Sequence, residues 1–237
     1  MKPYYEVHGT GSPLVLLHGA FGNIPMLGDV LPSLAATRRV IAIELEGHGH
    51  TPDAGRPMRP DTSADDVAAV LKELGIERAD IMGYSLGAGV AVHVASRHPE
   101  IVRKLVVVSR AYMRRGWSDQ TLAQMDALGP EFAEQMKQTP LYQIYTQIAP
   151  NPEHWPLLVA RIADGIKVDY DWTAEVSAIS APTLLVFGEN DGVRPEHPHQ
   201  FLKLLRQGEL VIIPGATHLT VFTSPLLIPA VTSFLDA

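Results

Sequence analysis

A serine between two glycines is the residue best suited to chemistry in this chain. It lies in Gly83–Gly87 (G-Y-S-L-G), directly after the strand-like run Asp80–Met82 and at the start of the helix-like run Ser85–Arg97. In a strand–turn–helix elbow the serine Oγ projects above the sheet, and the glycines are needed because strand and helix approach too closely for a Cβ. The motif and its flanks therefore predict Ser85 as a nucleophile rather than only a helix cap.

A serine hydroxyl is a poor nucleophile at neutral pH and needs a base within hydrogen-bond reach. The chain has ten histidines. His218 lies in a loop just after the last strand-like run, at the carboxyl edge of the sheet, where open α/β folds build their sites. Histidines without this placement are His8, His93, His98, His154, His197 and His199. We therefore predict His218 as the base.

The base in turn needs an acid that fixes its tautomer and stabilises the imidazolium. Asp191 follows the strand-like run Thr183–Phe187 at the same sheet edge, with Glu189 as the alternative two residues nearer the strand. We predict Asp191 in this role, which gives the chain order Ser, Asp, His.

Backbone N–H groups are expected to hold a developing oxyanion. Leu86 follows the nucleophile at a helix N-terminus, so its amide is the first candidate donor. The second should come from the loop His18–Gly22 after an early strand, with Ala20 preferred and Phe21 as the alternative. His18 itself is expected to brace this loop by hydrogen bonds.

His48 and His50 lie in the glycine-rich run Glu46–Thr51 and raise the possibility of a metal pair. No acidic or histidine partner of recognisable metal-ligand spacing lies nearby. A glycine-rich loop is therefore the preferred interpretation, and no metal site is predicted.

Short apolar runs bounded by turn residues predict buried strands of a mostly parallel sheet that would position these groups. They are Leu14–Leu17, Val40–Ile43, Ile81–Met82, Leu105–Val108, Leu184–Phe187 and Leu210–Ile213, with an edge strand near Tyr4–His8. Helical patterns between them cover Asp61–Leu74, Ser85–Arg97 and Glu196–Leu205. A final helix is expected to have Ser224 as its N-cap and to bend at Pro229.

Residues 111–180 interrupt this alternation, because they contain no clear strand and several proline or glycine stops. We predict a small helical cap over 111–180, inserted into an α/β core of 1–110 and 181–237. The alternative is a set of ordinary helices packed on the sheet.

Composition excludes several classes of protein. The 237 residues, 46% hydrophobic and 19% charged, fit one folded α/β unit. The net charge of −7 and the lack of a basic cluster argue against a nucleic-acid partner. The absence of cysteine excludes disulfides, thiolate catalysis and cysteine-ligated metals. No apolar run is long enough to cross a bilayer and no signal-peptide core is evident, so a cytoplasmic protein without a membrane partner is expected.

Three separated motifs, His18-Gly19, Gly83–Gly87 and Asp191…His218, resemble those of the α/β-hydrolase superfamily over nearly the whole chain. A fourth, Glu46–Thr51, resembles the family's G-x-G turn, although Glu44 stands where an Asp is usual. The resemblance is closest to small, cap-bearing bacterial carboxylesterase-like proteins. It implies the α/β-hydrolase fold and a chemistry that needs neither metal nor organic cofactor.

The implied reaction is hydrolysis of a small to medium carboxylic ester through an acyl-enzyme. Phe21, Tyr84 and Trp117, with the aromatic residues of the cap, predict an apolar substrate pocket. A C–C bond hydrolase or lactonase, an acyltransferase or perhydrolase, and a non-catalytic ligand-binding protein of this fold are the alternatives. An epoxide hydrolase or dehalogenase would need a carboxylate in place of Ser85. An aromatic surface on the cap leaves a homodimer open.

Overall fold

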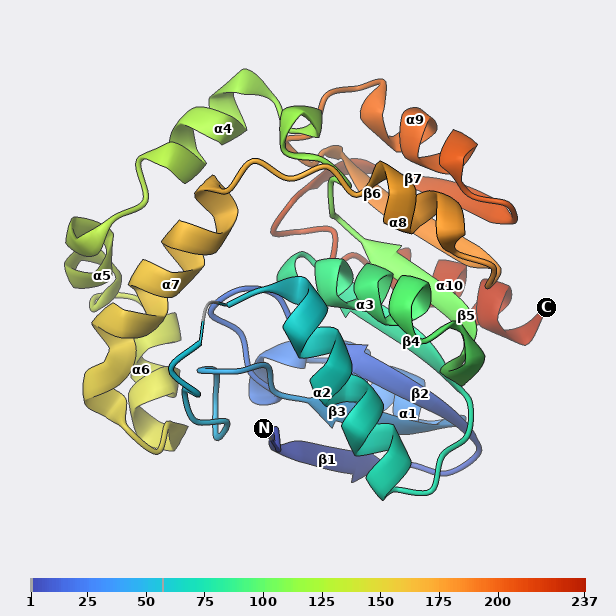
Figure 1. The fold of residues 1–237 in the computed structure, drawn as a ribbon, viewed down its shortest axis with the longest axis horizontal. Coiled ribbons are helices and arrows are strands. Elements are labelled where there is room, and N and C mark those ends of the chain that lie inside the picture. Colours follow the sequence, from blue (N-terminus) through green and yellow to red (C-terminus); the bar gives the residue numbers. More distant parts are fainter. Residues whose placement is uncertain (1, 57) are drawn as a thin grey trace.

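The computed structural model of the chain describes residues 2–56 and 58–237. Its centre is a seven-stranded sheet of order β1-β3-β2-β4-β5-β6-β7 (Figure 1). The strands are β1 Tyr5–His8, β2 Ser12–Leu17, β3 Arg38–Ile43, β4 Ala79–Tyr84, β5 Val102–Val108, β6 Thr183–Asn190 and β7 Gly208–Thr217. Residues 1 and 57, both within the predicted core range 1–110, lie outside the described residues.

The strand pairing confirms the predicted α/β class with a mostly parallel sheet. β1 pairs antiparallel with β3 at one edge, and every other neighbouring pair is parallel. The predicted apolar runs are strands because both faces of the sheet are covered: Leu14–Leu17 and Leu105–Val108, for example, are fully buried. β2 pairs with β3 on one side and with β4 on the other. The order of the strands therefore reverses between β2 and β4, and a crevice is expected at the carboxyl ends of these two strands.

Helices cover both faces of the sheet (Figure 1). One face carries α2 Pro60–Glu73, α3 Leu86–Arg97, α8 Thr173–Ala178 and α9 His197–Leu204, and the other carries α1 Val30–Ala35 and α10 Leu227–Asp236. The predicted helices Asp61–Leu74, Ser85–Arg97 and Glu196–Leu205 correspond to α2, α3 and α9, whereas α1 has no counterpart among the predicted elements. Short 3-10 turns lie at Pro25–Leu27, Pro99–Ile101, Arg114–Gly116 and Pro152–His154.

A helical insert separates β5 from β6, and most of it projects to one side of the sheet (Figure 1). Its helices are α4 Asp119–Asp126, α5 Pro130–Met136, α6 Pro140–Ile148 and α7 Trp155–Lys167. α5, α6 and α7 bury a cluster of their own around Trp155 and Val159, separate from the two clusters on the sheet, whereas α4 contributes no buried residue. The cluster beside α3 instead contains three residues from near the two ends of the predicted cap range 111–180, namely Tyr112, Trp172 and Val176. The separately packed part of the insert is therefore shorter than the range predicted.

The prediction for the last helix is wrong at its start. Leu226, not Ser224, is the N-cap of α10. Ser224 Oγ instead accepts a hydrogen bond from Leu226 N at 3.3 Å, which closes a turn before the helix. Pro229 falls in the first turn of α10, where a missing N–H interrupts no helical hydrogen bond, so the predicted cause of a bend is absent. Among the described residues, no helix has both the length and the apolar character needed to cross a membrane.

Candidate active site

Ser85 stands in a sharp turn between β4 and α3. Its φ of 52° lies in the left-handed region, which is unfavourable for a residue with a Cβ. A Cβ on Gly83 would lie 2.2 Å from the Gly87 carbonyl oxygen, and one on Gly87 would lie 2.5 Å from the His18 oxygen. Both glycines are therefore required by backbone contacts, and the strained serine is held at the carboxyl end of the sheet.

The structure brings the three predicted residues into one chain of hydrogen bonds. Ser85 Oγ lies 3.0 Å from His218 Nε2, and His218 Nδ1 lies 2.7 Å from Asp191 Oδ1. Since a carboxylate only accepts, His218 Nδ1 carries the proton and Nε2 is left to accept from the serine hydroxyl. This is the arrangement in which an imidazole can remove the proton of an attacking serine.

Asp191 is fixed by partners on its second oxygen. The side chain is fully buried, and its Oδ2 accepts hydrogen bonds from Ser109 Oγ and, at 3.0 Å, from Gly188 N. Ser109 directly follows β5 and has a φ of 54°, a strained conformation that the sequence did not indicate. Glu189, the alternative acid, is exposed and accepts from Gly215 N at 2.8 Å, so the structure does not bring it to His218.

Within the described residues, the loop after β2 leaves the Ala20 N–H without a protein acceptor and bonds the next N–H, that of Phe21, to a side chain. Phe21 N donates to His48 Nε2 at 3.1 Å, and this bond rules out the prediction of Phe21 as an oxyanion donor. Within the described part of the chain, the N–H groups of Ala20 and Leu86 donate to no protein acceptor. Those two amides are therefore free to hold an oxyanion.

Two buried histidines lock this loop in place. His18 Nε2 accepts from Leu45 N at 3.0 Å, and its Nδ1 donates to Gly19 O at 2.7 Å. His48 Nδ1 donates to the Glu46 carbonyl at 2.9 Å, while its Nε2 holds Phe21 N. Burial, with a smaller contribution from His48, lowers the pKa of His18 to about 3, and burial lowers the pKa of His48 to about 4. Both rings are thus neutral near pH 7 and act as hydrogen-bonding braces.

Glu44 and His50 hydrogen-bond to each other, and Glu44 also bonds the segment that follows the His18–Gly22 loop. The buried Glu44 carboxylate accepts from Ile24 N, His50 N and His50 Nδ1 at 2.6–3.1 Å. Glu44, which stands where the resemblance predicts an aspartate, therefore links two loops by hydrogen bonds. Among residues 2–56 and 58–237, no group of three or more His, Cys, Asp or Glu side chains is placed to hold a metal ion.

A cavity of about 1250 Å³ opens above Ser85. The predicted pocket residues Phe21, Tyr84 and Trp117 all line it. Tyr84 is held by its hydroxyl, which donates to the His218 carbonyl at 2.7 Å, and the Trp117 ring meets the His218 ring edge-on at 5.7 Å. Tyr170 and Trp172, two aromatic residues of the predicted cap range, line it as well. Residues that sequence reasoning did not assign to the pocket include His93 and Arg110, with Met125, Leu128, Leu141 and Ile162 of the insert.

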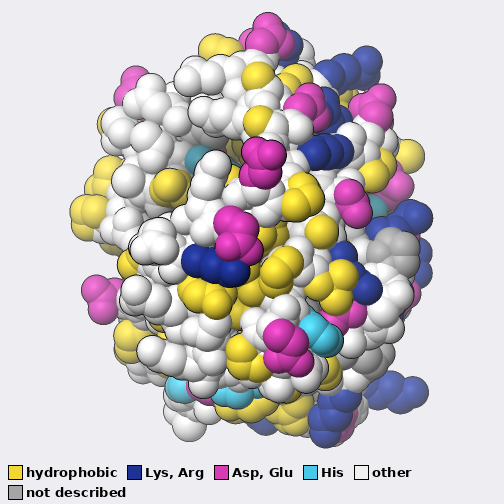
Figure 2. Space-filling model, turned by 90° about the vertical axis from the view of Figure 1, so that its left-hand side faces the viewer, with side chains coloured by type: hydrophobic (Ala, Val, Ile, Leu, Met, Phe, Trp, Pro, Cys, Tyr) yellow, Lys and Arg dark blue, Asp and Glu magenta, His cyan; other side chains and the backbone are white. Residues whose placement is uncertain are grey.

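The insert forms the outer wall of this cavity. Val168, just after α7, and Leu219, next to His218, line the cavity and are 59% and 77% exposed, so they lie at its mouth. Figure 2 views the molecule from the side of the insert, where hydrophobic side chains gather at the centre of the face among charged ones. Both of these residues at the mouth of the cavity are apolar.

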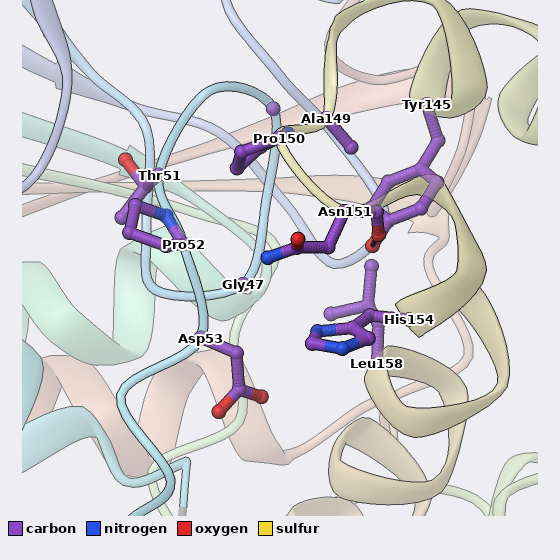
Figure 3. A pocket seen from close by; sticks show the side chains of 11 residues that line it. Gly47, Thr51, Pro52, Asp53, Tyr145, Ala149, Pro150, Asn151, His154 and Leu158 are labelled. Carbon is purple, nitrogen blue, oxygen red and sulfur yellow. Dashed lines mark hydrogen bonds between the residues drawn. The ribbon is translucent and has the colours of Figure 1, made fainter.

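A second, much smaller pocket lies between the loop after β3 and the insert (Figure 3). Thr51 and Asp53 line it from the loop, and Tyr145, Asn151 and His154 line it from the insert. Its volume of about 10 Å³ is close to the space for a single water, and none of the three triad residues lines it. It is a packing gap at a junction rather than a substrate site.

Comparison with known proteins gives the same fold along the chain. Three curated relatives are similar to it. The first is the dihydrolipoyllysine-residue acetyltransferase component of an acetoin cleaving system of Pseudomonas putida, with 29% identity over 91% of this chain and 61% of the relative. The second is a pimeloyl-[acyl-carrier protein] methyl ester esterase of Neisseria meningitidis, with 30% identity over 86% of this chain and 85% of the relative. The third is a 2-hydroxymuconate semialdehyde hydrolase of Pseudomonas sp., with 38% identity over 53% of this chain and 46% of the relative. The chain thus spans less than two thirds of the first and third of these.

A solved structure of a thermophilic esterase from Thermogutta terrifontis superposes with a TM-score of 0.77 at 24% identity, over 99% of this chain and 93% of that one. At that identity the likeness shows the fold alone. The family model for the alpha/beta hydrolase fold matches residues 12–225, which include Ser85, Asp191 and His218. The chain therefore belongs to the α/β-hydrolase fold family.

Proposed function

We propose that the protein hydrolyses carboxylic esters of small to medium size through an acyl-enzyme on Ser85. The observation that carries the proposal is the continuous hydrogen-bonded chain Ser85–His218–Asp191, with separations of 3.0 and 2.7 Å, at the floor of a large, mostly apolar cavity. A ligand-binding protein has no need of all three groups in this alignment. The methyl ester esterase relative, which the chain matches over most of both lengths, also supports ester hydrolysis.

In the first step Ser85 Oγ attacks the ester carbonyl while His218 Nε2 takes the hydroxyl proton. The N–H groups of Ala20 and Leu86 hold the oxyanion, and each contributes about 3–4 kcal/mol to stabilising the transition state. His218 then returns the proton to the leaving alcohol. Water, deprotonated by the same nitrogen, releases the acid and restores Ser85. Asp191 keeps His218 in the required tautomer throughout.

The insert is proposed to act as a cap that selects the substrate. Leu128, Leu141 and Ile162 face the cavity from the insert, opposite the strand-end loops that carry the triad. The acyl or alcohol group of the ester would therefore be enclosed between apolar walls, which favours apolar over strongly hydrated substrates.

Ser85→Ala is the direct test. We expect kcat for p-nitrophenyl butyrate to fall by about 10⁶-fold, or to the detection limit, and labelling by a fluorophosphonate probe to disappear. The exposed Ser177, whose hydroxyl donates to the Thr173 carbonyl, supplies the matched control Ser177→Ala. Full turnover by Ser85→Ala would overturn the proposal.

The assignment of the acid is tested separately. Asp191→Asn should lower kcat by about 10³–10⁴-fold because the wrong tautomer of His218 is then favoured. Glu189→Gln, which changes an exposed carboxylate two residues away, should leave kcat within about twofold. The reverse ranking would move the role to Glu189.

The relative named 2-hydroxymuconate semialdehyde hydrolase supports a second candidate, hydrolysis of a C–C bond or a lactone by the same triad. A panel of p-nitrophenyl esters, lactones and dienoic diketones separates the two. Values of kcat/KM that are highest for the diketones would favour the second candidate.

A further inference from the structure

Arg110 is a buried cation that the catalytic mechanism does not use. Its side chain lines the large cavity although the residue is only 7% exposed. Its Nε is buried without a hydrogen-bond partner, and within the described part of the chain the guanidinium forms no ion pair or hydrogen bond. A guanidinium has five N–H donors, and leaving a buried one unpartnered is costly.

Two aromatic rings hold this guanidinium in position. Arg110 Cζ lies 4.9 Å from the Tyr170 ring centroid and 4.8 Å from that of Trp172. The two rings are adjacent, with centroids 4.5 Å apart, and Tyr170 is fixed by hydrogen bonds from Trp117 Nε1 and to the Ala111 carbonyl. Such contacts stabilise the charge through the ring faces and leave the in-plane N–H groups available.

The position of Arg110 relative to the nucleophile follows from α3. A Cβ on Gly89 would lie 3.4 Å from Arg110 Nε and 3.0 Å from Trp172, so this arginine rests on the helix at Gly89. Gly89 N donates to Ser85 O at 3.2 Å, which places Gly89 one helical turn, about 6 Å along the axis, from Ser85. His93, the next residue on the same face, also lines the cavity.

From this geometry we propose that Arg110 is the recognition site for a carboxylate on the substrate, held one helical turn from the scissile ester. The planar fork of a guanidinium matches a carboxylate through two parallel hydrogen bonds. Five acidic side chains line the same cavity: Asp61, Asp164, Asp169, Asp171 and Glu175. Asp61 pairs with Arg59 and Asp171 with Arg115. Within the described residues none of the five forms an ion pair with Arg110, so the position is open to a ligand. The preferred substrates are half-esters of short dicarboxylic acids.

This inference rests on the proposed ester hydrolysis and is tested with paired substrates. Monomethyl glutarate and methyl valerate have the same acyl chain length and differ in a terminal carboxylate or methyl group. The measured quantity is the ratio of their kcat/KM values. In Arg110→Met the ratio should fall about tenfold or more, as expected for loss of a charge-assisted bidentate contact. Arg110→Lys, which keeps the charge but not the fork, should give an intermediate ratio.

Arg59→Met is the matched control. Arg59 lines the same cavity but is exposed and already paired with Asp61 at 3.1 Å. The same loss of charge there should change the ratio by less than about twofold. An equal fall in both methionine variants would show a general effect of charge and overturn the assignment.

A binding measurement separates this inference from the proposed function. Calorimetry of glutarate with the Ser85→Ala protein needs no turnover, and adding Arg110→Met should weaken binding about tenfold or more. If wild type hydrolyses esters but neither the ratio nor glutarate binding depends on Arg110, the carboxylate site is wrong and the esterase proposal stands. If no ester is hydrolysed yet glutarate binds through Arg110, the site stands and the esterase proposal fails. Should Arg110→Met not fold, the Arg110→Lys variant decides by the same two measurements.

Discussion

His48 offers a sharp test of how the proposed oxyanion-binding loop is held. The ring is fully buried, accepts from Phe21 N and donates to the Glu46 carbonyl. Phe21 has a φ of 61°, so the loop keeps a strained shape only while its contacts hold it there. His48→Ala removes both hydrogen bonds and should let the neighbouring Ala20 N–H move away from the oxyanion position.

The expected magnitudes follow from those contacts. Each buried group left without a partner costs about 1–3 kcal/mol, so the free energy of unfolding should fall by roughly 2–6 kcal/mol. Complete loss of an oxyanion donor costs about 10²–10³ in kcat. Because the loop is loosened rather than removed, we expect kcat to fall about 10–100-fold with little change in KM. In His48→Gln the amide oxygen can accept from Phe21 N, and kcat should stay within about fivefold of wild type.

The assay is hydrolysis of p-nitrophenyl butyrate at pH 7.5, with urea unfolding followed by circular dichroism on the same samples. The exposed His199 supplies the control His199→Ala, which should change neither quantity. If His48→Ala is destabilised but keeps the wild-type kcat, His48 supports the fold only and does not position Ala20.

Three further predictions follow from the site. Since the pKa values of His18 and His48 are lowered to about 3 and about 4, the unfolded chain binds more protons below pH 6.5, and the free energy of unfolding should fall as pH is lowered from about 6.5 to 4. Urea titrations across this range should show up to about 1.4 kcal/mol lost per pH unit for each histidine, and a flat profile would contradict the burial argument. Ser109→Ala removes a hydrogen bond to the Asp191 carboxylate and should lower kcat about tenfold with KM nearly unchanged, as steady-state kinetics would show. Gly83→Ala would place a Cβ 2.2 Å from a backbone oxygen of α3, so fluorophosphonate labelling and Tm should both drop, and a fully labelled variant would refute the close-contact argument.

Much of the fold was predictable because the central parallel strands are covered on both faces, so each appears in the sequence as a continuous apolar run. The edge strand β7 is partly exposed. The last helix was less predictable, since Ser224 followed by a proline resembles a helix start. There the serine hydroxyl bonds the Leu226 amide and closes a turn, so the helix begins three residues later. Only tertiary packing decides whether such a serine caps the helix or closes a turn before it.

In the candidate site, too, some residues could be predicted from the sequence and others could not. Ser85, Asp191 and His218 each follow a strand, so their convergence at one sheet edge could be argued from the sequence. Ser109 and Arg110 also follow a strand, but their roles depend on partners far along the chain. Ser109 meets Asp191 82 residues later, and Arg110 meets aromatic rings that reach it only after the insert has folded back.

The place where the insert joins the sheet has an evolutionary consequence. β5 and β6 are hydrogen-bonded neighbours, so the chain leaves the sheet and rejoins it at adjacent points. A recombination that exchanges residues 119–167 would leave unchanged the register of the sheet, the turn that carries Ser85 and the loop that carries His218. New substrate ranges can then arise by replacing one contiguous stretch of gene, while the arginine and its two rings, which lie just outside that stretch, would be inherited with the scaffold.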